Sequence, residues 1–171
     1  MRITTCRAED LDPIEEVLPS PSAFSYHLQR YARQVAGTST FLVARLDDDR
    51  PAGVCEVRWN GCAAPEVRAV VADCPEINGL HVVEALQSRG TGSALIRRAE
   101  RLAAERGRRL VGLGVDDHGN PRAAALYARL GYRPTVRYLD RYSFTDDAGV
   151  EHPVEEPAVF LVKELGPHDR S

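Results

Sequence analysis

A short glycine-rich stretch in the middle of the chain carries the residue types that bind phosphate. It reads Gln87-Ser88-Arg89-Gly90-Thr91-Gly92, between an apolar run and a long amphipathic segment, and this pattern predicts a strand, a turn and a helix. The first N–H groups of a helix have no carbonyl partner within it, and the helix dipole favours negative charge there. Glycine lets an anion approach the backbone, while Arg89 adds a positive charge at the rim. The stretch therefore predicts a phosphate-binding turn.

Two common phosphate-binding motifs differ from this turn. A nucleotide-hydrolase loop requires Gly-Lys-Ser/Thr, whereas Gly92 is followed by Ser93-Ala94-Leu95. A dinucleotide-binding turn has a third glycine where this chain has Leu95, and it usually follows the first strand of its domain. The remaining alternative is a helix start that merely tolerates glycine.

A second pattern marks another helix. Asn120 is a good helix cap, Pro121 suits the first turn, and Gly131 lies just past the expected end. Tyr127 follows Asn120 by seven residues, so both lie on one face of the helix, two turns apart. A hydroxyl in that position can donate a proton to a leaving group. The alternative is that Tyr127 is a core residue of an amphipathic helix.

Hydrophobic periodicity along the chain predicts the strands and helices that must position these residues. Strands are expected at about 2–7, 41–44, 52–59, 76–83, 110–115, 132–142 and 159–162, and helices at about 14–18, 23–36, 93–106 and 121–130. The strand–helix–strand unit over 76–115 predicts that its two strands pair in parallel.

The helix over 23–36 has a regular apolar spacing. Phe24, Leu28 and Tyr31 recur at i, i+4 and i+7, which predicts that they form one buried stripe. The same helical periodicity turns Arg30 and Arg33 toward water.

Three motifs stand in a fixed order along the chain. They are Glu76-Ile77-x-x-Leu80-x-Val82, then Gln87-x-Arg89-Gly90-x-Gly92-Ser93-x-Leu95, then Asn120-Pro121-x-Ala123-x-x-Leu126-Tyr127-x-x-Leu130-Gly131-Tyr132. In this order they resemble the GNAT superfamily of N-acetyltransferases over about Glu76–Tyr132. The resemblance implies an α/β, GNAT-like fold: a mixed sheet of about six to seven twisted strands, helices on both faces, and a V-shaped splay between the two central parallel strands.

The resemblance also implies that acetyl-CoA is the acyl donor. The turn would hold its pyrophosphate through Gln87, Ser88, Arg89, Gly90, Thr91, Gly92 and Ser93. The preceding strand would pair with the pantetheine arm through Leu80, His81 and Val82, and Asn120 would touch the same arm while capping its helix. The chain departs from the family at Glu84, where proline is common, and at Gln87, where arginine is common and glutamine is a known alternative.

The chemistry of acetyl transfer assigns roles to two residues. An alkyl amine has a pKa near 10, so only about one molecule in a thousand is the neutral nucleophile at pH 7. By resemblance, Glu76 is the candidate general base, acting directly or through water, and Tyr127 is the candidate general acid toward the departing thiolate. A backbone N–H near Val82 would stabilise the oxyanion. Glu76 is otherwise a solvent-facing carboxylate, and the alternative bases are His27, His81 and His118.

The expected function is transfer of an acetyl group from acetyl-CoA to a primary amine of a small molecule or peptide. Two alternatives remain: a non-catalytic regulatory module that binds acyl-CoA, and an acyltransferase that uses a longer acyl-CoA. The sequence does not identify the acceptor amine. Acids near the expected closing hairpin would attract a cationic amine, unless they serve solubility alone: Asp146, Asp147, Glu151, Glu155 and Glu156.

The composition is that of an ordinary globular protein. The chain has 171 residues, 43% hydrophobic and 27% charged, which fits one domain over residues 1–165 with a disordered tail at 166–171. A net charge of −3 argues against a nucleic-acid partner. The arginines between residues 97 and 109 are expected to form the solvated face of a helix.

The cysteine spacing and the first residues allow predictions about metal binding and cellular compartment. Four cysteines, Cys6, Cys55, Cys62 and Cys74, have no metal-ligand spacing, so reduced, buried thiols and no metal are expected. No apolar run approaches the length of a membrane span or a signal core. We therefore expect a cytoplasmic protein without a membrane partner, as a monomer or a homodimer.

Overall fold

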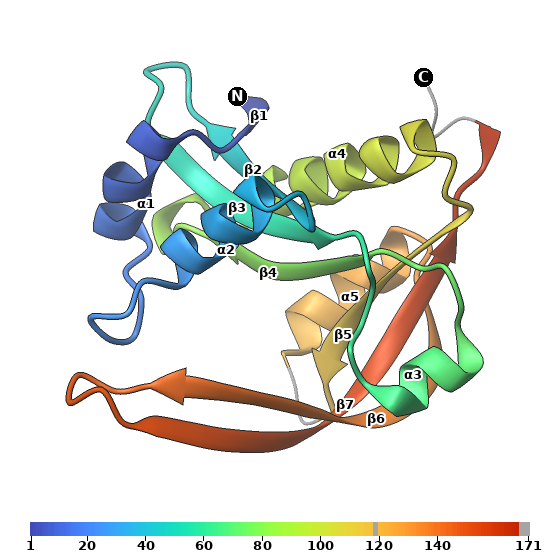
Figure 1. The fold of residues 1–171 in the computed structure, drawn as a ribbon. Coiled ribbons are helices and arrows are strands. Elements are labelled where there is room, and N and C mark those ends of the chain that lie inside the picture. The colour runs from blue at the N-terminus through green and yellow to red at the C-terminus, as the bar shows by residue number, and fades with distance from the viewer. Residues whose placement is uncertain (118–119, 168–171) are drawn as a thin grey trace. The chain divides into compact units, whose positions relative to one another are not determined.

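The computed structural model describes residues 1–117 and 120–167. Its strands are β1 (Arg2–Thr5), β2 (Ser39–Arg45), β3 (Pro51–Arg58), β4 (Glu76–Val82), β5 (Leu110–Asp116), β6 (Arg133–Thr145) and β7 (Glu151–Glu164). Its helices are α1 (Leu11–Val17), α2 (Tyr26–Val35), α3 (Pro65–Val70), α4 (Thr91–Glu105) and α5 (Pro121–Arg129), with short 3-10 turns η1 (Ala8–Asp10) and η2 (Glu84–Leu86) (Figure 1). The seven strands form a mixed sheet in the order β1-β2-β3-β4-β5-β7-β6, which confirms the predicted α/β class.

The first compact unit comprises residues 1–59 and 77–99. Strands β1, β2 and β3 form an antiparallel meander, with Arg2 opposite Arg45 and Ser39 opposite Arg58. Its core contains buried apolar residues from the β1 end, α1, β2 and β3: Cys6, Ile14, Phe41, Val43 and Val54. The antiparallel ladder and this core position β3, which lies beside β4.

Strand β4 lies close to both β3 and the start of α4. The Val83 N–H donates to the Ala52 carbonyl at 2.9 Å. A Cβ atom added at Gly53 would lie 2.9 Å from the His81 carbonyl oxygen and 3.3 Å from the side chains of Thr91 and Leu95. Glycine is therefore required at position 53 for the close approach of β3, β4 and α4.

The predicted apolar stripe over residues 23–36 is wrong for Phe24 and Leu28, whereas Tyr31 is half-buried and packs against the core of the first unit. Phe24 and Leu28 are 45% and 55% exposed, whereas His27 and Arg30 are buried. The helix begins after Ser25, whose hydroxyl accepts a hydrogen bond from the Leu28 N–H at 3.1 Å. Its inner face is polar because it packs against a buried carboxylate on β3, which apolar periodicity within the helix does not reveal.

The second compact unit comprises residues 60–76 and 100–171. Strand β7 pairs antiparallel with β5 on one side and with β6 on the other, and β6 and β7 continue as a long hairpin (Figure 1). This hairpin is longer than expected, because β6 continues to Thr145 and β7 begins at Glu151 instead of residue 159. Helix α3 was not expected from the sequence; Pro65 occupies its first turn.

The core of the second unit forms around β5. It contains Cys62, Val67, Cys74, Tyr138, Ala158 and Phe160. A side chain at Gly112 would collide with the Phe160 ring, and one at Gly114 would collide with the Tyr138 hydroxyl. The register pairs Glu76, the first residue of β4, with Gly112 in parallel, which confirms the predicted parallel pairing of β4 and β5.

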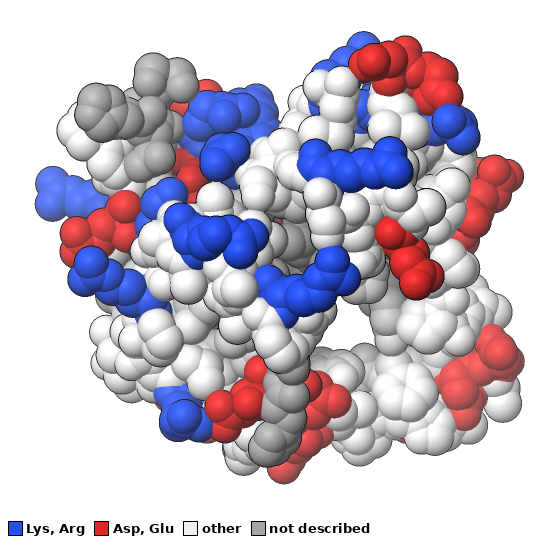
Figure 2. Space-filling model, turned by 180° about the vertical axis from the view of Figure 1, so that it is seen from behind, with Lys and Arg blue, Asp and Glu red and all other residues white. Residues whose placement is uncertain are grey.

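Charged side chains are mixed over the surface. Arg97, Arg106 and Arg109 are exposed, and the other arginines between residues 97 and 109 are only partly buried, as expected for a solvated helix face. On the face in Figure 2, basic and acidic side chains are interspersed. Within residues 1–117 and 120–167, no helix combines the length and apolar character needed to cross a membrane.

Candidate active site

The glycine-rich turn lies between η2 and α4. Ser88 and Gly90 have left-handed backbone angles, with φ of 61° and 87°. Helix α4 begins at Thr91, and its first internal bond runs from the Ala94 N–H to the Gly90 carbonyl at 3.0 Å. The three preceding N–H groups thus come before the helical ladder, as at any helix start. A Cβ atom at Gly90 would meet no atom within 4 Å, so the space above the turn is open.

The backbone of β4 presents alternate groups to its two edges. The His81 carbonyl lies against β3, and the Val83 N–H bonds to β3 as well. Because successive residues of a strand direct their backbone groups to opposite edges, those of Leu80 and Val82 point away from β3. The Gln87 side chain donates from Nε2 to the Val82 carbonyl at 3.3 Å, in agreement with that direction. Strand and turn are therefore linked by a side chain of the turn itself.

The other predicted residues of the turn differ in exposure. Gln87, Ser88, Arg89 and Gly90 are exposed, Gly92 and Ser93 are half-buried, and Thr91 is buried. The Thr91 hydroxyl donates to the Met1 sulfur at 3.4 Å, so this side chain faces the protein interior. Any contact from Thr91 to an anion would therefore use its backbone N–H. All predicted donor-binding residues except Asn120 lie in the first unit.

Glu76, the candidate base, lies in the second unit and is only 4% exposed. It is therefore not the solvent-facing carboxylate of the alternative interpretation. Burial, followed by the charge of Glu76, raises the pKa of the Cys62 thiol to about 12, and the thiol also hydrogen-bonds to this carboxylate. Burial and the same charge raise the pKa of Cys74 to about 12. The thiol neighbours of Glu76 were not anticipated, because Cys62 is far from it in sequence and has no motif.

Asn120 and Tyr127 also lie in the second unit, on α5. The Asn120 Oδ1 accepts hydrogen bonds from the N–H groups of Arg122 and Ala123, at 3.0 and 3.4 Å, and so caps the helix as predicted. Its side-chain NH₂ group is not part of that cap. Tyr127 is half-buried, and its ring meets the Tyr132 ring edge to face.

The histidines fall into different environments. His27 is buried; its Nδ1 lies 3.3 Å from Arg30 Nη1 and its Nε2 lies 2.7 Å from the Leu18 carbonyl oxygen. Because the guanidinium can only donate, Nδ1 must accept, and the ring is neutral with its proton on Nε2. Burial and the charge of Arg30 lower the His27 pKa, in agreement. The His81 side chain is exposed, and His118 lies outside the described residues.

Across residues 1–117 and 120–167, no group of three or more His, Cys, Asp or Glu side chains is arranged to hold a metal ion. All four cysteines are free and buried, as predicted.

Comparison with known proteins identifies the family. Residues 7–132 match the model of the acetyltransferase (GNAT) family. No curated protein gives a significant match. Solved structures that share the fold include the ribosomal-protein-S18-alanine N-acetyltransferase of Escherichia coli, with 19% identity, TM-score 0.66 and coverage of 96% of this chain and 94% of that chain.

Two further structures share the fold at similar coverage. An N-acetyltransferase of Staphylococcus aureus Mu50 has 14% identity and TM-score 0.70, with 96% of this chain and 98% of that chain covered. An aminoglycoside 6'-N-acetyltransferase complexed with coenzyme A has 16% identity and TM-score 0.63, with 98% of each chain covered. The family match covers well over half of the sequence, and the chain belongs to the acetyltransferase (GNAT) family.

Proposed function

We propose that this protein transfers the acetyl group of acetyl-CoA to a primary amine of a small molecule or peptide. One observation carries the proposal. The β4 backbone at Leu80 and Val82 points away from β3 and leads into a left-handed turn at the start of α4. An arm with amide groups pairs with such a strand edge, and a pyrophosphate binds such a helix start.

Residues of the first unit would bind the pyrophosphate and the pantetheine arm of acetyl-CoA. Backbone N–H groups of the turn from Gln87 to Ser93 would hold the pyrophosphate, and the exposed Arg89 would add charge. Gly90 supports this assignment because nothing fills the space where its Cβ would be. Leu80, His81 and Val82 would carry the pantetheine arm, with Asn120 as a further contact from its NH₂ group. An aminoglycoside N-acetyltransferase of the same fold is known in complex with coenzyme A.

Acid–base roles follow from the chemistry of the two reacting groups. The ammonium form of the acceptor must lose a proton before its nitrogen attacks, and Glu76 would accept that proton, directly or through a water molecule. Charge that develops on the carbonyl oxygen would be stabilised by a backbone N–H at Val82. Tyr127 would donate its hydroxyl proton to the sulfur as the thiolate departs, and the proton that the acylated nitrogen loses would return to the tyrosinate, directly or through water.

Proteins of this fold are named for chemically different acceptors. Solved proteins of this fold have names that span a ribosomal protein, an aminoglycoside and spermidine as acceptors. We propose a small-molecule or peptide amine on this basis. The protein would act as a monomer or a homodimer.

A thiol-release assay with acetyl-CoA and a panel of amines tests the function directly. Acetyl transfer predicts release of free coenzyme A that depends on an amine, with the acetylated amine detected by mass spectrometry. Acetyl-CoA binding without release for any amine would favour the regulatory module. Faster turnover with propionyl- or longer acyl-CoA would favour the alternative donor.

A further inference from the structure

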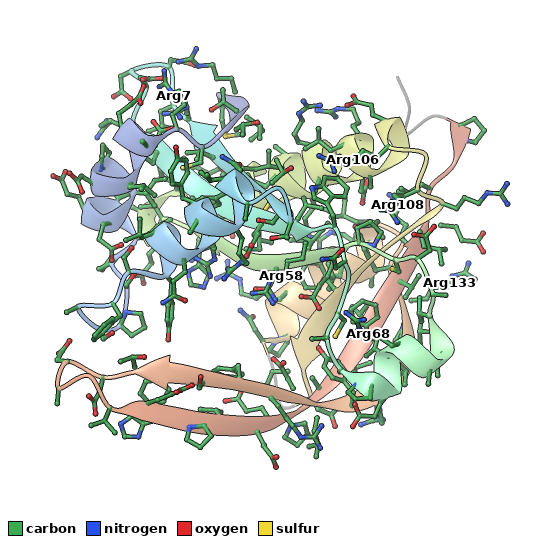
Figure 3. The ribbon with its side chains drawn as sticks, viewed as in Figure 1. Arg7, Arg58, Arg68, Arg106, Arg108 and Arg133 are labelled. Atoms are coloured by element: carbon green, nitrogen blue, oxygen red, sulfur yellow. The ribbon has the colours of Figure 1, made fainter. Side chains whose placement is uncertain are left out.

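A cluster of three arginines surrounds a single buried carboxylate in the first unit. Glu56 on β3 is fully buried and accepts two hydrogen bonds from Arg33, from Nε at 2.6 Å and from Nη2 at 2.8 Å. Arg58 Nε lies 3.4 Å from Glu56 Oε2, and Arg30 Nε lies 4.0 Å from the same oxygen. Figure 3 shows Arg58 extending from the end of β3. We call Arg30, Arg33, Arg58 and Glu56 the arginine cluster.

Three guanidinium groups lie within 4.0 Å of one carboxylate, that of Glu56. Both oxygens of Glu56 are already engaged by the bidentate pair with Arg33. An arginine is almost never buried without a paired anion, because removing its charge from water is costly. Arg30, which lies 4.0 Å from Glu56 and makes no hydrogen bond to it, is therefore the member with the capacity to bind a further anion.

Arg30 has few hydrogen-bond partners for a buried guanidinium group. It is 9% exposed, yet it makes one hydrogen bond among the described residues, to His27 Nδ1 at 3.3 Å. Its separation of 4.0 Å from Glu56 is too long for a hydrogen bond. A guanidinium has five N–H groups, so most donors of Arg30 remain available on a largely buried side chain. Burial lowers the Arg30 pKa, as expected for a cation with too little compensating negative charge.

Arg30 reaches the strand that leads into the proposed donor site. A Cβ atom added at Gly79 on β4 would lie 2.5 Å from Arg30 Nη2, so glycine makes room there for the guanidinium. Gly79 has a left-handed φ of 61°, which turns the β4 backbone at this point. It stands one residue before Leu80 and three after Glu76, the candidate base. The Arg30 guanidinium thus lies beside Gly79, next to the β4 residues proposed to carry the acetyl donor.

We propose that the acceptor amine also carries a carboxylate, and that Arg30 binds this carboxylate beside Gly79. The inference rests on the acetyl-transfer function proposed above. Guanidinium groups bind carboxylates through paired, charge-assisted hydrogen bonds, and Arg30 has donors that Glu56 does not engage. Arg33 and Arg58, which are paired with Glu56, would add electrostatic attraction for the carboxylate of the acceptor. Polyamines, which carry only positive charge, are poor acceptors in this proposal.

Matched acceptors provide the test on the wild-type protein. We would compare ω-amino carboxylates of several chain lengths with the corresponding ω-amino amides, and include spermidine, in the coenzyme A release assay. The proposal expects kcat/KM for the best carboxylate to exceed that for its amide by about 10-fold or more, the scale of a hydrogen bond to a charged group. Equal values, or preference for spermidine, would overturn it. If no amine supports release, the acetyl-transfer function itself fails.

The Arg30→Gln variant tests the residue. Glu56 keeps its bidentate pair with Arg33 in this variant, so the fold should persist, and circular dichroism checks this. The carboxylate preference should fall by about 10-fold while kcat/KM for the amide and KM for acetyl-CoA stay unchanged. Arg97→Gln, which removes an exposed arginine from α4, is the charge-matched control and should retain the preference.

Two results would contradict the assignment to Arg30. One is a folded Arg30→Gln protein with the wild-type ratio of carboxylate to amide. The other is a raised KM for acetyl-CoA, which would assign Arg30 to the donor. If Arg30→Gln does not fold, Arg58→Gln replaces it: the proposal then expects a smaller drop in the same ratio, and an unchanged ratio in a folded Arg58→Gln protein would overturn it.

Discussion

The rings of Tyr127 and Tyr132 meet edge to face, with 6.2 Å between their centroids and 66° between their planes. The Tyr132 hydroxyl is buried and donates to Glu100 Oε1 at 2.9 Å, while Lys163 Nζ donates to Glu100 Oε2 at 2.9 Å. Burial and the charge of Glu100 raise the Tyr132 pKa well above its usual range. Tyr132 is therefore bound to a structural ion pair, and Tyr127 is the neighbour with a candidate catalytic role.

Replacing each tyrosine by phenylalanine separates these roles. Tyr127→Phe keeps the ring contact and removes the proposed proton donor, so kcat should fall by roughly 10²-fold while the acetyl-CoA dissociation constant changes little. Tyr132→Phe should leave kcat unchanged but lower the free energy of unfolding by about 1–2 kcal/mol, because it removes a buried hydrogen bond to a charged group. Rates and urea unfolding of both variants provide the check. Wild-type turnover in a folded Tyr127→Phe protein, with chemistry rate-limiting, would make Tyr127 a packing residue.

Glu76→Gln should impair catalysis in a pH-dependent way. The amide has nearly the shape of the carboxylate but cannot accept a proton, so the rate should fall by roughly 10²-fold at neutral pH. Rising pH deprotonates the acceptor in solution, and the variant should therefore approach the wild type as pH nears the pKa of the amine. The measurement is the pH–rate profile, with Glu105→Gln on the exposed end of α4 as control. A neutral-pH rate equal to that of the wild type would transfer the role to a histidine or to water.

Gly90→Val should weaken acetyl-CoA binding. Acetyl-CoA should raise the melting temperature of the wild type, because a ligand that binds only the folded state stabilises it. The valine side chain would enter the open space above the turn, and the temperature shift should be lost. Gly107→Val is a matched control: Gly107 follows the opposite end of α4, has φ of 74°, and its Cβ would also meet nothing within 4 Å. Both variants carry similar backbone strain, so an equal ligand-induced shift in the two would place the phosphate site elsewhere.

Glu56→Gln should destabilise the fold strongly. It removes the only carboxylate of the arginine cluster, and loss of one partner of a buried ion pair typically costs about 3–5 kcal/mol. Urea unfolding measures the change, and Asp48→Asn, at an exposed pair with Arg50, should have no measurable effect. A Glu56→Gln protein as stable as the wild type would contradict the view that this carboxylate holds the cluster together.

The same carboxylate predicts a pH dependence of stability. Burial raises the Glu56 pKa, but the hydrogen bond from Arg33 and the charges of Arg58 and Arg33 outweigh it, so the pKa is lowered from its ordinary value of 4.5. A group with a depressed folded-state pKa stabilises the fold above its unfolded pKa and loses that contribution as pH falls through the folded value. Wild-type stability should therefore decline below about pH 4.5, and this decline should be shallower in Glu56→Gln.

The thiols should be unreactive in the folded protein. Burial raises the pKa of Cys6, Cys55, Cys62 and Cys74 to about 12 in each case. At pH 8 nearly all are protonated and shielded, so a disulfide reagent should label them slowly until denaturant is added. Fast labelling of one thiol without denaturant would show that its site opens. The expected result would also remove protein background from coenzyme A release assays.

The sequence by itself determined the strand–turn–helix of the proposed donor site and the cap of α5. Each depends on residues close together in the chain: Gly90 adopts a left-handed angle that side chains disfavour, and Asn120 bonds to N–H groups two and three residues ahead. Such local requirements are visible as residue types at fixed spacing. The parallel pairing of β4 and β5 was also predictable from the sequence. Two strands joined by a crossover helix in the same sheet run parallel.

Only the tertiary structure decided which side chains are buried on α2 and around Glu76. Periodicity assigned Leu28 inward and Arg30 outward, yet the carboxylate of Glu56 on β3 reverses this order. Cys62 likewise meets Glu76 only through the fold. The physical reason is that burial of a charged group depends on a partner of opposite charge, and here that partner comes from a distant strand. Spacing within one helix carries no information about such a partner, so polar contacts between distant elements had to come from the structure.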